Sequence, residues 1–287
     1  LENKIIMAGS FQTQPPSTAH YLVSFPQPQT LLITINRERQ RNSLPSDAHW
    51  EAHELLTWFD HEPSLLVAVI TGAGKKAFCA GQDLQEQSSK QSRHLSLAQK
   101  ALFTHPPTGF AGLSQRKGLK PVLAAVNGFA LGGGFEICLN CDIVVASPTA
   151  EFGLPEAGVG LFAAAGGLPR LARVCGMQLA TELALTCRRL PAQEAMALRL
   201  INRISKTPES LLEETLAIAK RITAFSPDAI LVTRQGLREA WETSSVQHAT
   251  SRTREAYVDR VLRGENFKIG VDAFAKKVQP QWRESKI

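Results

Sequence analysis

Hydrophobic and polar positions follow two different periods along the chain, and the period changes near residue 205. Before that point, short apolar runs rich in β-branched residues end in glycine or proline, which is typical of buried strands. The runs that fit this pattern are "YLVSFPQPQTLLITINR", "SLLVAVITGAG", "KPVLAAVNGFA" and "CDIVVAS", and Pro and Gln split the first into a predicted hairpin. Helical periodicity, as over residues 45–61, separates these runs, so the pattern predicts an α/β core.

After residue 205 the pattern has a helical period throughout. The segments "PESLLEETLAIAKRITAF" and "PDAILVTRQGLREAW" each begin with Pro at a plausible first helical position, and further helical segments surround Ala256 and Ala273. The first residues show no such order. We therefore expect a disordered tail over residues 1–19, a mixed core over 20–205 and a helical region over 206–287.

Composition excludes several classes of protein. The chain is 44% hydrophobic and 20% charged, as in ordinary globular proteins, and it has no apolar run long enough for a transmembrane helix, so no membrane partner is expected. The five scattered cysteines form neither a disulfide framework nor a zinc motif, which favours a reducing compartment. The net charge of +6 suits an anionic ligand or a solvated surface, and without a basic-aromatic cluster nucleic acid is not expected as a partner.

Three consecutive glycines in "VNGFALGGGFEICLNCD" lie at a predicted junction of strand and helix. The first N–H groups of a helix have no intrahelical partner, and glycine lets a ligand approach them closely. The junction therefore suits an anion or a developing oxyanion, although a tight packing turn is the alternative. A second turn, "KKAFCAGQDLQE", could present N–H groups to the same oxygen.

Two carboxyl groups accompany these turns. Glu136 follows the glycines, and Glu156 follows Pro155 in a stretch with little other charge. Two carboxylates beside an oxyanion-binding turn are suited to acid/base chemistry next to a carbonyl. Helix capping by Glu156 and a solvent-facing Glu136 are the alternatives.

The blocks "AFCAGQDL", "VNGFALGGGFEICLNCDIVVAS" and "AEFGLPEAGVG" together resemble the signature of the crotonase superfamily and are most similar to enoyl-CoA hydratase. The resemblance extends from "LLITINRERQRNSL" to "GVDAFAKKVQPQW", nearly all of the chain after residue 20. It implies a spiral of repeated β-β-α units with a helical C-terminal trimerisation region, assembled as a trimer or a dimer of trimers.

The resemblance also implies a site for an acyl-CoA thioester. The backbone N–H groups of Gln82 and Gly133 would hold the thioester oxygen, while Glu136 activates water and Glu156 supplies the α-proton. The implied coenzyme A and substrate contacts are Arg39, Ser43, Lys76, Ala80, Asp83, Leu84, Phe274 and Lys277. Coenzyme A enters as part of the substrate, so no separate cofactor and no metal are expected.

Two segments depart from the hydratase pattern. Hydratases commonly have Pro-Gly where this chain has Ala163 and Ala164, and alanine resists a positive φ, which affects how water can be positioned. The segment Leu84 to Leu119 is long and polar; in the superfamily this region shapes the acyl pocket, so either an unusual acyl chain or an ordinary surface loop would explain it.

Other candidate residues receive structural interpretations. His49 and His53 have a spacing that can hold a metal, but a third ligand is not evident and we expect solvent-facing histidines. Asp142 is expected to form structural hydrogen bonds. Cys138 and Cys141 are expected to pack rather than react.

The leading function is hydration of a 2-enoyl-CoA, which needs both glutamates. A Δ3,Δ2-enoyl-CoA isomerase would need one base, expected at Glu156, whereas a carnitinyl-CoA dehydratase or another specialised hydratase would use nearly the same residues. An RNA-binding member of the fold is the non-enzymatic alternative. The terminal residues Ser285, Lys286 and Ile287 resemble a peroxisomal address, with the mitochondrion or cytoplasm as alternatives.

Overall fold

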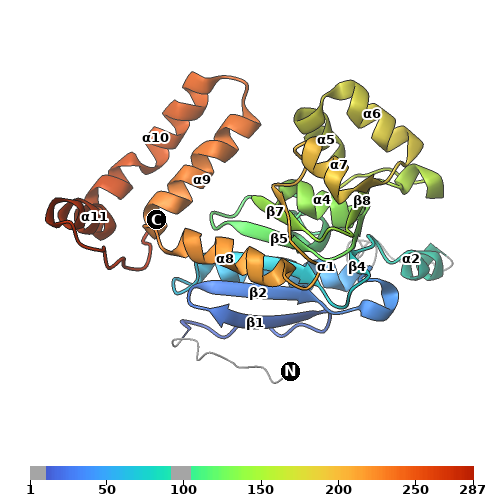
Figure 1. Ribbon diagram of the computed structural model, residues 1–287, viewed down its shortest axis with the longest axis horizontal. Helices are drawn as coiled ribbons and strands as arrows, with labels where there is room; N and C mark the ends of the chain where they lie inside the picture. Colours follow the sequence, from blue (N-terminus) through green and yellow to red (C-terminus); the bar gives the residue numbers. More distant parts are fainter. Residues whose placement is uncertain (1–10, 92–104) are drawn as a thin grey trace.

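Strands of the first two thirds of the chain form two sheets (Figure 1). The computed structural model describes residues 11–91 and 105–287. The larger sheet has the strand order β1-β2-β3-β5-β7-β10 and the smaller sheet β4-β6-β8-β9. The strands are β1 Tyr21–Gln27, β2 Thr30–Ile35, β3 Val67–Gly72, β4 Ala77–Cys79, β5 Val122–Val126, β6 Phe129–Leu131, β7 Ile143–Ala146, β8 Glu151–Gly153, β9 Leu190–Pro191 and β10 Arg203–Ile204.

Helices follow the strands in a regular order. The α-helices described are α1 Ser46–His61, α2 Leu84–Gln91, α4 Gly133–Asn140, α5 Gly167–Cys175, α6 Met177–Thr186, α7 Ala192–Ala197, α8 Leu211–Thr223, α9 Pro227–Glu242, α10 Val246–Arg263 and α11 Glu265–Lys276. Short 3₁₀ helices are η1 Glu38–Gln40, η2 Phe110–Gly112 and η3 Glu156–Val159. From β3 to α5 the chain repeats one unit three times: a strand in the larger sheet, a strand in the smaller sheet, then a helix. This arrangement confirms the expected β-β-α spiral with a helical C-terminal region.

One apolar run forms two strands instead of the single strand that we predicted. The run "KPVLAAVNGFA" is β5 up to Val126 and β6 from Phe129, and the chain passes between the sheets at Asn127 and Gly128. Asn127 fixes this corner because its Oδ1 accepts from the Gly72 N–H at 3.1 Å and its Nδ2 donates to the Gly74 carbonyl at 2.8 Å. Hydrophobicity does not mark the break because the residues of both strands are apolar.

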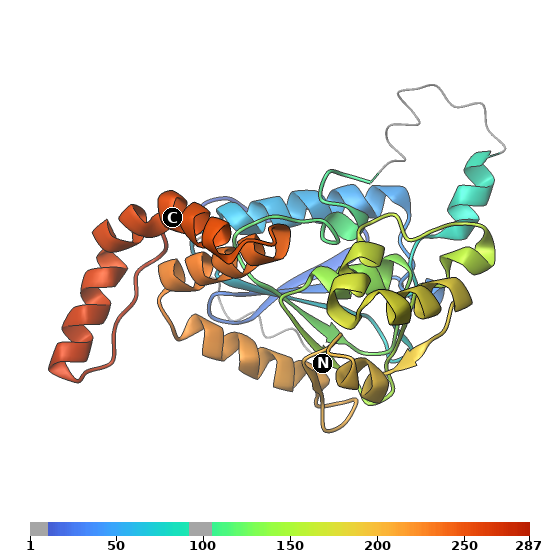
Figure 2. The same cartoon turned by 90° about the horizontal axis from the view of Figure 1, so that it is seen from above.

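The two faces of the larger sheet are covered by different helices (Figure 2). Leu31, Ile33 and Ile35 of β2 share a core cluster with the apolar side of α1, whereas Leu32 belongs to the cluster that contains α8. Alternate residues of a strand point to opposite faces. The parallel centre of the sheet is therefore buried on both sides, which explains its continuous apolar runs.

Residues 11–19 do not form the disordered tail that we expected. Phe11 packs against Phe25 and Trp58, with ring centroids 4.7 and 5.5 Å apart, and the Trp58 indole N–H donates to the Thr13 carbonyl at 3.0 Å. Buried aromatic area of this kind outweighs the entropy of ordering a short polar segment. Residues 1–10 lie outside the described part of the chain.

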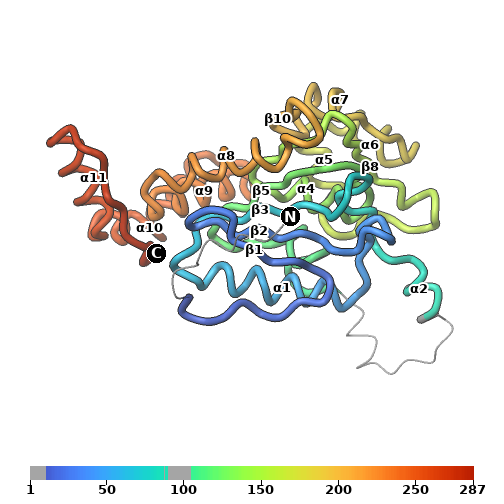
Figure 3. The backbone as a smooth tube through the Cα atoms, turned by 60° about the horizontal axis from the view of Figure 1, so that its bottom comes forward, coloured from blue at the N-terminus to red at the C-terminus, as the bar shows by residue number. Residues whose placement is uncertain are grey.

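Helices α9, α10 and α11 extend from one end of the molecule, opposite the end that carries α2 (Figures 1 and 3). Asp142, at the start of β7, holds α9 against the core by accepting from Arg234 Nε and Arg238 Nη2, both at 2.9 Å, and from the Val122 N–H at 2.8 Å. The predicted structural role of Asp142 is confirmed. In the part of the chain described, none of the helices combines the length and apolar character needed to cross a membrane.

Candidate active site

Three turns meet at the carboxyl ends of three adjacent parallel strands. Strands β4, β6 and β8 are neighbours in the smaller sheet. The turn with Gln82 follows β4, the glycine run follows β6, and Glu156 follows β8. Loops at the carboxyl ends of parallel strands are the usual position of ligand sites in α/β proteins. The topology thus gathers residues that are more than seventy positions apart in the sequence, as the numbers of Gln82 and Glu156 show.

Each of the three glycines meets a separate steric requirement. Gly132 has φ +56°, which disfavours any residue with a Cβ. A Cβ on Gly133 would lie 2.6 Å from the Phe110 ring, and a Cβ on Gly134 would clash with the Cys79 carbonyl oxygen. The run therefore serves close packing, which was the alternative explanation, and its role in holding an oxyanion stays a prediction.

Two backbone N–H groups at these turns have no acceptor among the described residues. In a parallel bridge with Leu44, the neighbours of Gln82 make the pairing hydrogen bonds: Leu44 N–H donates to the Gly81 carbonyl, and Asp83 N–H donates to the Leu44 carbonyl, both at 2.9 Å. Within residues 11–91 and 105–287, no oxygen accepts from the N–H of Gln82 or of Gly133, the first residue of α4. A Cβ on Gly81 would lie 3.6 Å from the Gly133 nitrogen, so the two turns are in contact. The structure thus brings together the two predicted oxyanion donors.

Glu136 is buried and held in place by the next helix. Its side chain is 3% exposed, and Oε1 accepts from the Gly167 N–H at 2.8 Å. Burial raises the pKa of Glu136, while hydrogen bonds from the Gly167 and Ala165 backbone and the charge of Arg170 oppose that rise. Because Gly167 is the first residue of α5, the helix dipole also favours the ionised carboxylate. The alternative of a solvent-facing Glu136 is wrong.

Glu156 has few partners in comparison. Burial and then the nearby charge of Glu136 raise its pKa to about 7, against a lowering by a hydrogen bond from its own backbone. Its Oε2 is buried without a hydrogen-bond partner in the described structure, and Oε1 would lie 3.2 Å from a Cβ on Gly132. The two carboxyl groups therefore differ. Glu136 is held by N–H donors, whereas Glu156 can take up or release a proton near neutral pH.

Gly167 and Ala165 are functional residues that sequence reasoning did not identify. Their backbone groups anchor Glu136, from the segment in which Ala163 and Ala164 replace Pro-Gly. Positive φ angles in this segment occur at Gly160 and Gly166, not at the alanines. The substitution therefore requires no strained alanine. The sequence feature that could have indicated these residues is the Gly-Gly pair before the Pro of "GGLPRL", because such a pattern is typical of the start of a helix.

Most predicted coenzyme A contacts lie beside the oxyanion turn. The segment that contains Arg39 and Ser43 runs along the turn after β4, where the Ala80 N–H donates to the Arg41 carbonyl at 3.1 Å. Lys76 precedes β4, and both Lys76 and Arg39 are exposed cations. These side chains are free to meet the phosphates of a ligand that approaches the two N–H donors.

Asp83 and Leu84 have structural positions at the same turn. The Asp83 carboxylate forms an ion pair with Arg37 at 2.6 Å and accepts from the Gln85 N–H at 3.2 Å at the start of α2. Leu84 is the first residue of α2 and is exposed. Asp83 therefore fixes the turn, and its side chain is not free for a ligand.

Phe274 and Lys277 are not brought to this site within one chain. Both lie at the end of α11, on the helical arm at the opposite end of the molecule from α2 (Figures 1 and 3). The Phe274 side chain is 87% exposed. Any contact of this segment with coenzyme A would have to come from another copy of the chain.

The histidines of α1 differ from expectation. His49 is not solvent-facing: it is 1% exposed, its Nε2 lies 2.9 Å from Gln82 Oε1, and its Nδ1 accepts from the Ala111 N–H at 3.1 Å. His53, partly buried, contacts Thr108 Oγ1 at 2.9 Å. In the described residues, no three His, Cys, Asp or Glu side chains are placed to hold a metal ion. Burial raises the pKa of both Cys138 and Cys141, which agrees with packing rather than reactive thiols.

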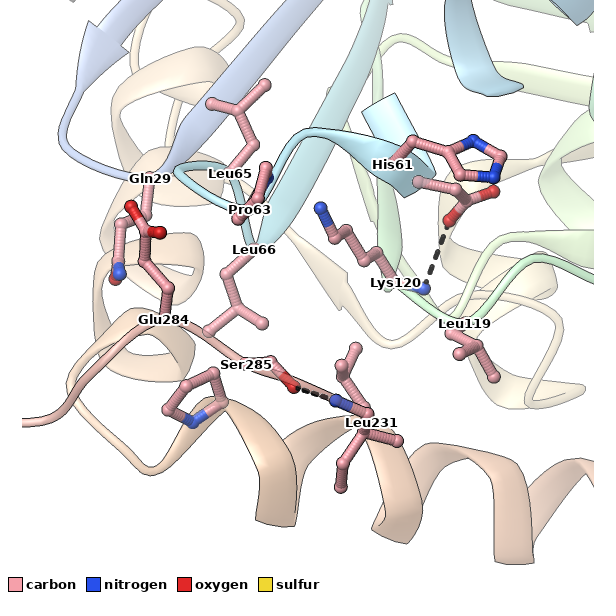
Figure 4. Close-up of a pocket in the computed structure, with 13 residues that line it drawn as sticks. Gln29, His61, Pro63, Leu65, Leu66, Leu119, Lys120, Leu231, Glu284 and Ser285 are labelled. Atoms are coloured by element: carbon pink, nitrogen blue, oxygen red, sulfur yellow. Dashed lines mark hydrogen bonds between the residues drawn. The ribbon is translucent and has the colours of Figure 1, made fainter. Parts of the chain in front are cut away.

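A cavity of about 210 Å³ lies elsewhere, between the end of α1, Lys120 and the C-terminal residues Glu284 and Ser285 (Figure 4). Lys120 Nζ donates to the Phe59 and Glu62 carbonyls at 2.8 and 2.5 Å, and burial lowers its pKa to about 8. None of the predicted catalytic or oxyanion residues lines this cavity. It is therefore separate from the candidate active site.

Comparison with known proteins agrees with this geometry. The family model described as enoyl-CoA hydratase/isomerase matches residues 27–285. The chain is 46% identical over 272 residues to the mevalonyl-coenzyme A hydratase sidH of Aspergillus fumigatus, with 95% of this chain and 98% of that protein covered. It is 35% identical over 260 residues to the carnitinyl-CoA dehydratase of Escherichia coli K12, with 88% and 94% covered.

Among solved structures, an enoyl-CoA hydratase from Mycobacterium tuberculosis H37Rv superposes with a TM-score of 0.81 at 32% identity, over 93% of this chain and 100% of that one. The chain belongs to the enoyl-CoA hydratase/isomerase family, a part of the crotonase superfamily. Its named relatives are hydratases and dehydratases of coenzyme A thioesters.

Proposed function

We infer that the protein is a hydro-lyase that adds water to, or removes it from, the acyl group of a coenzyme A thioester. The observation that carries this inference is the placement of the Gln82 and Gly133 N–H groups, which have no acceptor in the described structure, beside two carboxyl groups in different environments. Family membership supports the thioester, and the relatives that are hydratases or dehydratases support the reaction.

The geometry divides the chemical roles. The thioester oxygen accepts from the Gln82 and Gly133 N–H groups, which stabilise the enolate oxyanion; one such donor is typically worth roughly 10²–10³ in rate. Glu136, ionised, takes a proton from water as the water oxygen bonds to the β-carbon. Glu156, protonated, gives its proton to the α-carbon. Both steps reverse in dehydration, and the two glutamates exchange protonation states in each direction.

The polar side chains next to the donors favour an acyl group with a polar substituent. Gln82 Oε1 lies 2.9 Å from His49 Nε2 and 3.5 Å from His105 Nε2, so polar side-chain atoms lie next to the donors. A fatty acyl chain would be better matched by apolar side chains at this position. Mevalonyl and carnitinyl, the acyl groups named for two relatives, each carry a polar substituent besides the 3-hydroxyl group that hydration forms, a 5-hydroxyl group and a trimethylammonium group. A short acyl group with such a polar substituent is therefore the substrate class that we favour over straight-chain 2-enoyl groups.

Assembly and location complete the proposal. Exposed apolar side chains on α11, Phe267, Val271 and Phe274, support a homotrimer or a dimer of trimers in which α11 meets another copy. The peroxisomal location rests on the terminal tripeptide, with the mitochondrion or cytoplasm as alternatives, and it stays a prediction.

Product analysis in ¹⁸O-labelled water tests the reaction. Wild type, Glu136→Gln and Glu156→Gln would each be incubated with straight-chain 2-enoyl-CoA, 3-enoyl-CoA and 5-hydroxy-3-methyl-2-enoyl-CoA esters. The masses of the products would be measured by mass spectrometry. We expect label in a 3-hydroxyacyl product, best with the hydroxylated ester, and a loss of at least about 10²-fold in both variants.

Other outcomes would contradict the proposal. Double-bond migration without label that survives Glu136→Gln would make the protein an isomerase. Nucleic-acid binding with steep salt dependence, together with no turnover of any ester, would support the non-enzymatic member of the fold.

A further inference from the structure

His49 connects the two segments that carry the oxyanion donors. It lies in α1, buried, and reaches the Gln82 side chain on the turn after β4. On its other side it accepts from the backbone N–H of Ala111 in η2, and its ring lies 4.5 Å from the ring of Phe110. The Phe110 ring in turn occupies the space against Gly133, where a Cβ would lie 2.6 Å away. One imidazole therefore contacts both halves of the site, directly at Gln82 and through Phe110 at Gly133.

The hydrogen-bond partners fix the chemical state of His49. A backbone N–H can only donate, so Nδ1 must be the acceptor of the Ala111 N–H. The proton of the neutral ring is then on Nε2, which donates to Gln82 Oε1 at 2.9 Å. The same logic orients the Gln82 amide, because its oxygen faces His49 and its NH₂ group must face elsewhere.

The Ala111 end of this connection is strained and confined. Ala111 has φ +51°, which is unusual for a residue with a Cβ, and it is fully buried. Such a conformation persists only where the surroundings hold it, and residues of this kind concentrate at functional sites. The Phe110 N–H donates to Ser114 Oγ at 2.9 Å, and the Ala111 N–H donates to His49, so two side chains fix the turn that presents Phe110.

We propose that His49 is a positioning residue of the oxyanion site: as a neutral imidazole it holds the Gln82 turn and the Phe110–Ala111 turn at the separation that the two N–H donors require. It touches no reacting atom. Its effect is on the geometry of the Gln82 and Gly133 N–H groups, which serve the transition state more than the bound ester. The inference rests on the proposed function, because these donors matter only if an oxyanion develops.

Steady-state kinetics of His49 variants test the inference. His49→Leu removes both hydrogen bonds at similar volume, whereas His49→Gln retains one acceptor and one donor, the oxygen and the nitrogen of its amide group. We expect His49→Leu to lower kcat by about 10²-fold with KM changed less than about threefold, as for a small misplacement of catalytic groups. His49→Gln should recover most of kcat. Gln82→Ala should also lower kcat, and the double variant should lose less than the product of the two single losses.

His53→Leu is the matched control. His53 lies one turn further on α1 and contacts the same loop at Thr108, and in the described structure no hydrogen bond joins it to Gln82. The His53→Leu variant should lower the melting temperature about as much as His49→Leu does, while kcat should stay within about threefold of wild type. An equal loss of kcat in both leucine variants, or full kcat in folded His49→Leu, would overturn the inference.

A measurement without substrate separates this inference from the proposed function. In ¹⁵N-histidine-labelled wild type, NMR should show His49 with an unprotonated Nδ1 and a protonated Nε2, and Gln82→Ala should change only the Nε2 environment. The opposite tautomer would refute the positioning role even if the enzyme hydrates esters normally. Conversely, wild type that shows this tautomer but turns over no ester would refute the proposed function alone.

Discussion

The two glutamates have the same side chain, and their surroundings give them different chemistry. Glu136 receives N–H donors from Gly167 and Ala165 at the start of α5, which favour its ionised form. Glu156 has a buried oxygen without a partner in the described structure and a pKa raised to about 7, chiefly by burial. A pair of carboxyl groups with divergent environments can supply one base and one acid at the same pH.

This difference predicts the same pH dependence in the two directions of reaction. Hydration needs Glu136 ionised and Glu156 protonated, whereas dehydration needs the reverse, so both directions start from a pair that holds one proton. Because the reaction takes up and releases no net proton, the ratio of the two kcat/KM values does not change with pH. Both values should therefore fall as pH rises through about 7, where the pair loses its proton. Initial rates in both directions between pH 5 and 9 would show this fall, and a kcat/KM that stays constant above pH 7 would mean that Glu156 is not the group that titrates.

The folding equilibrium offers a control on the same residue. Because the pKa of Glu156 is higher in the folded state than in the unfolded chain, its contribution to stability is present at low pH and is lost as pH rises through about 7. Glu156→Gln cannot titrate, so the stability difference between it and wild type should change across this range. Chemical denaturation at several pH values would measure it.

Between elements, the decisive contacts are those that hold helices to the spiral. The α9 helix is attached to the core by the carboxylate of Asp142, which bridges Arg234, Arg238 and the first backbone N–H of β5. Burial raises the pKa of Asp142, but the charges of Arg234 and Arg238 together with hydrogen bonds from Val122 and Arg234 outweigh burial and hold that pKa below its usual value. A buried ion pair is weak evidence for stability by itself, but removing one partner leaves an uncompensated buried charge.

Asp142→Asn should therefore destabilise the protein by about 3–5 kcal/mol, because it leaves the buried Arg234 without its counter-charge. Asp259→Asn is the matched control: its ion pair with Arg263 is exposed on both sides, and we expect a change below about 1 kcal/mol. Urea denaturation would measure both. Equal effects of the two substitutions would show that the Asp142 contacts do not hold α9.

At the scale of the whole molecule, α9 is attached to the core, but α11 at the far end of the arm leaves large apolar side chains exposed within the described structure. Phe274 and Lys277 resemble residues that help close a coenzyme A site, yet they lie on α11, far from the glutamates (Figure 1). Large exposed apolar side chains on α11 are typical of a surface covered by another subunit. The location of these residues is consistent with sites completed between copies in a closed assembly.

We therefore expect complementation between two inactive variants. Glu136→Gln lacks the base, and Phe274→Asp disrupts the segment contributed by α11. Co-expression in equal amounts should restore activity in about a quarter of all sites, those that combine an intact Glu136 with a neighbour's intact Phe274. Light scattering would establish the oligomeric state. Co-expression of wild type with the double variant Glu136→Gln, Phe274→Asp gives the reference activity. Activity no higher than the sum of the two separate variants would contradict a site shared between subunits.

The sequence alone determined the local features and the chemical parts of the site. The antiparallel hairpin, the helix ending at His61 and the helix opened by Pro227 follow from periodicity and capping, which depend on neighbouring residues. The glycine run, the glutamates and the turn with Gln82 were recognisable because their motifs are contiguous. Resemblance to a family then gave the order of the spiral.

Only the tertiary structure decided how these parts meet. It showed that Phe11 packs into the core, that the chain crosses between sheets at Asn127, and that His49 is buried between Gln82 and Ala111. It also gave Glu136 its anchors at Gly167 and Ala165, and placed Phe274 away from the site. Burial, hydrogen-bond partners and pKa depend on contacts between residues far apart in the chain, and a period along the sequence carries no information on those distances.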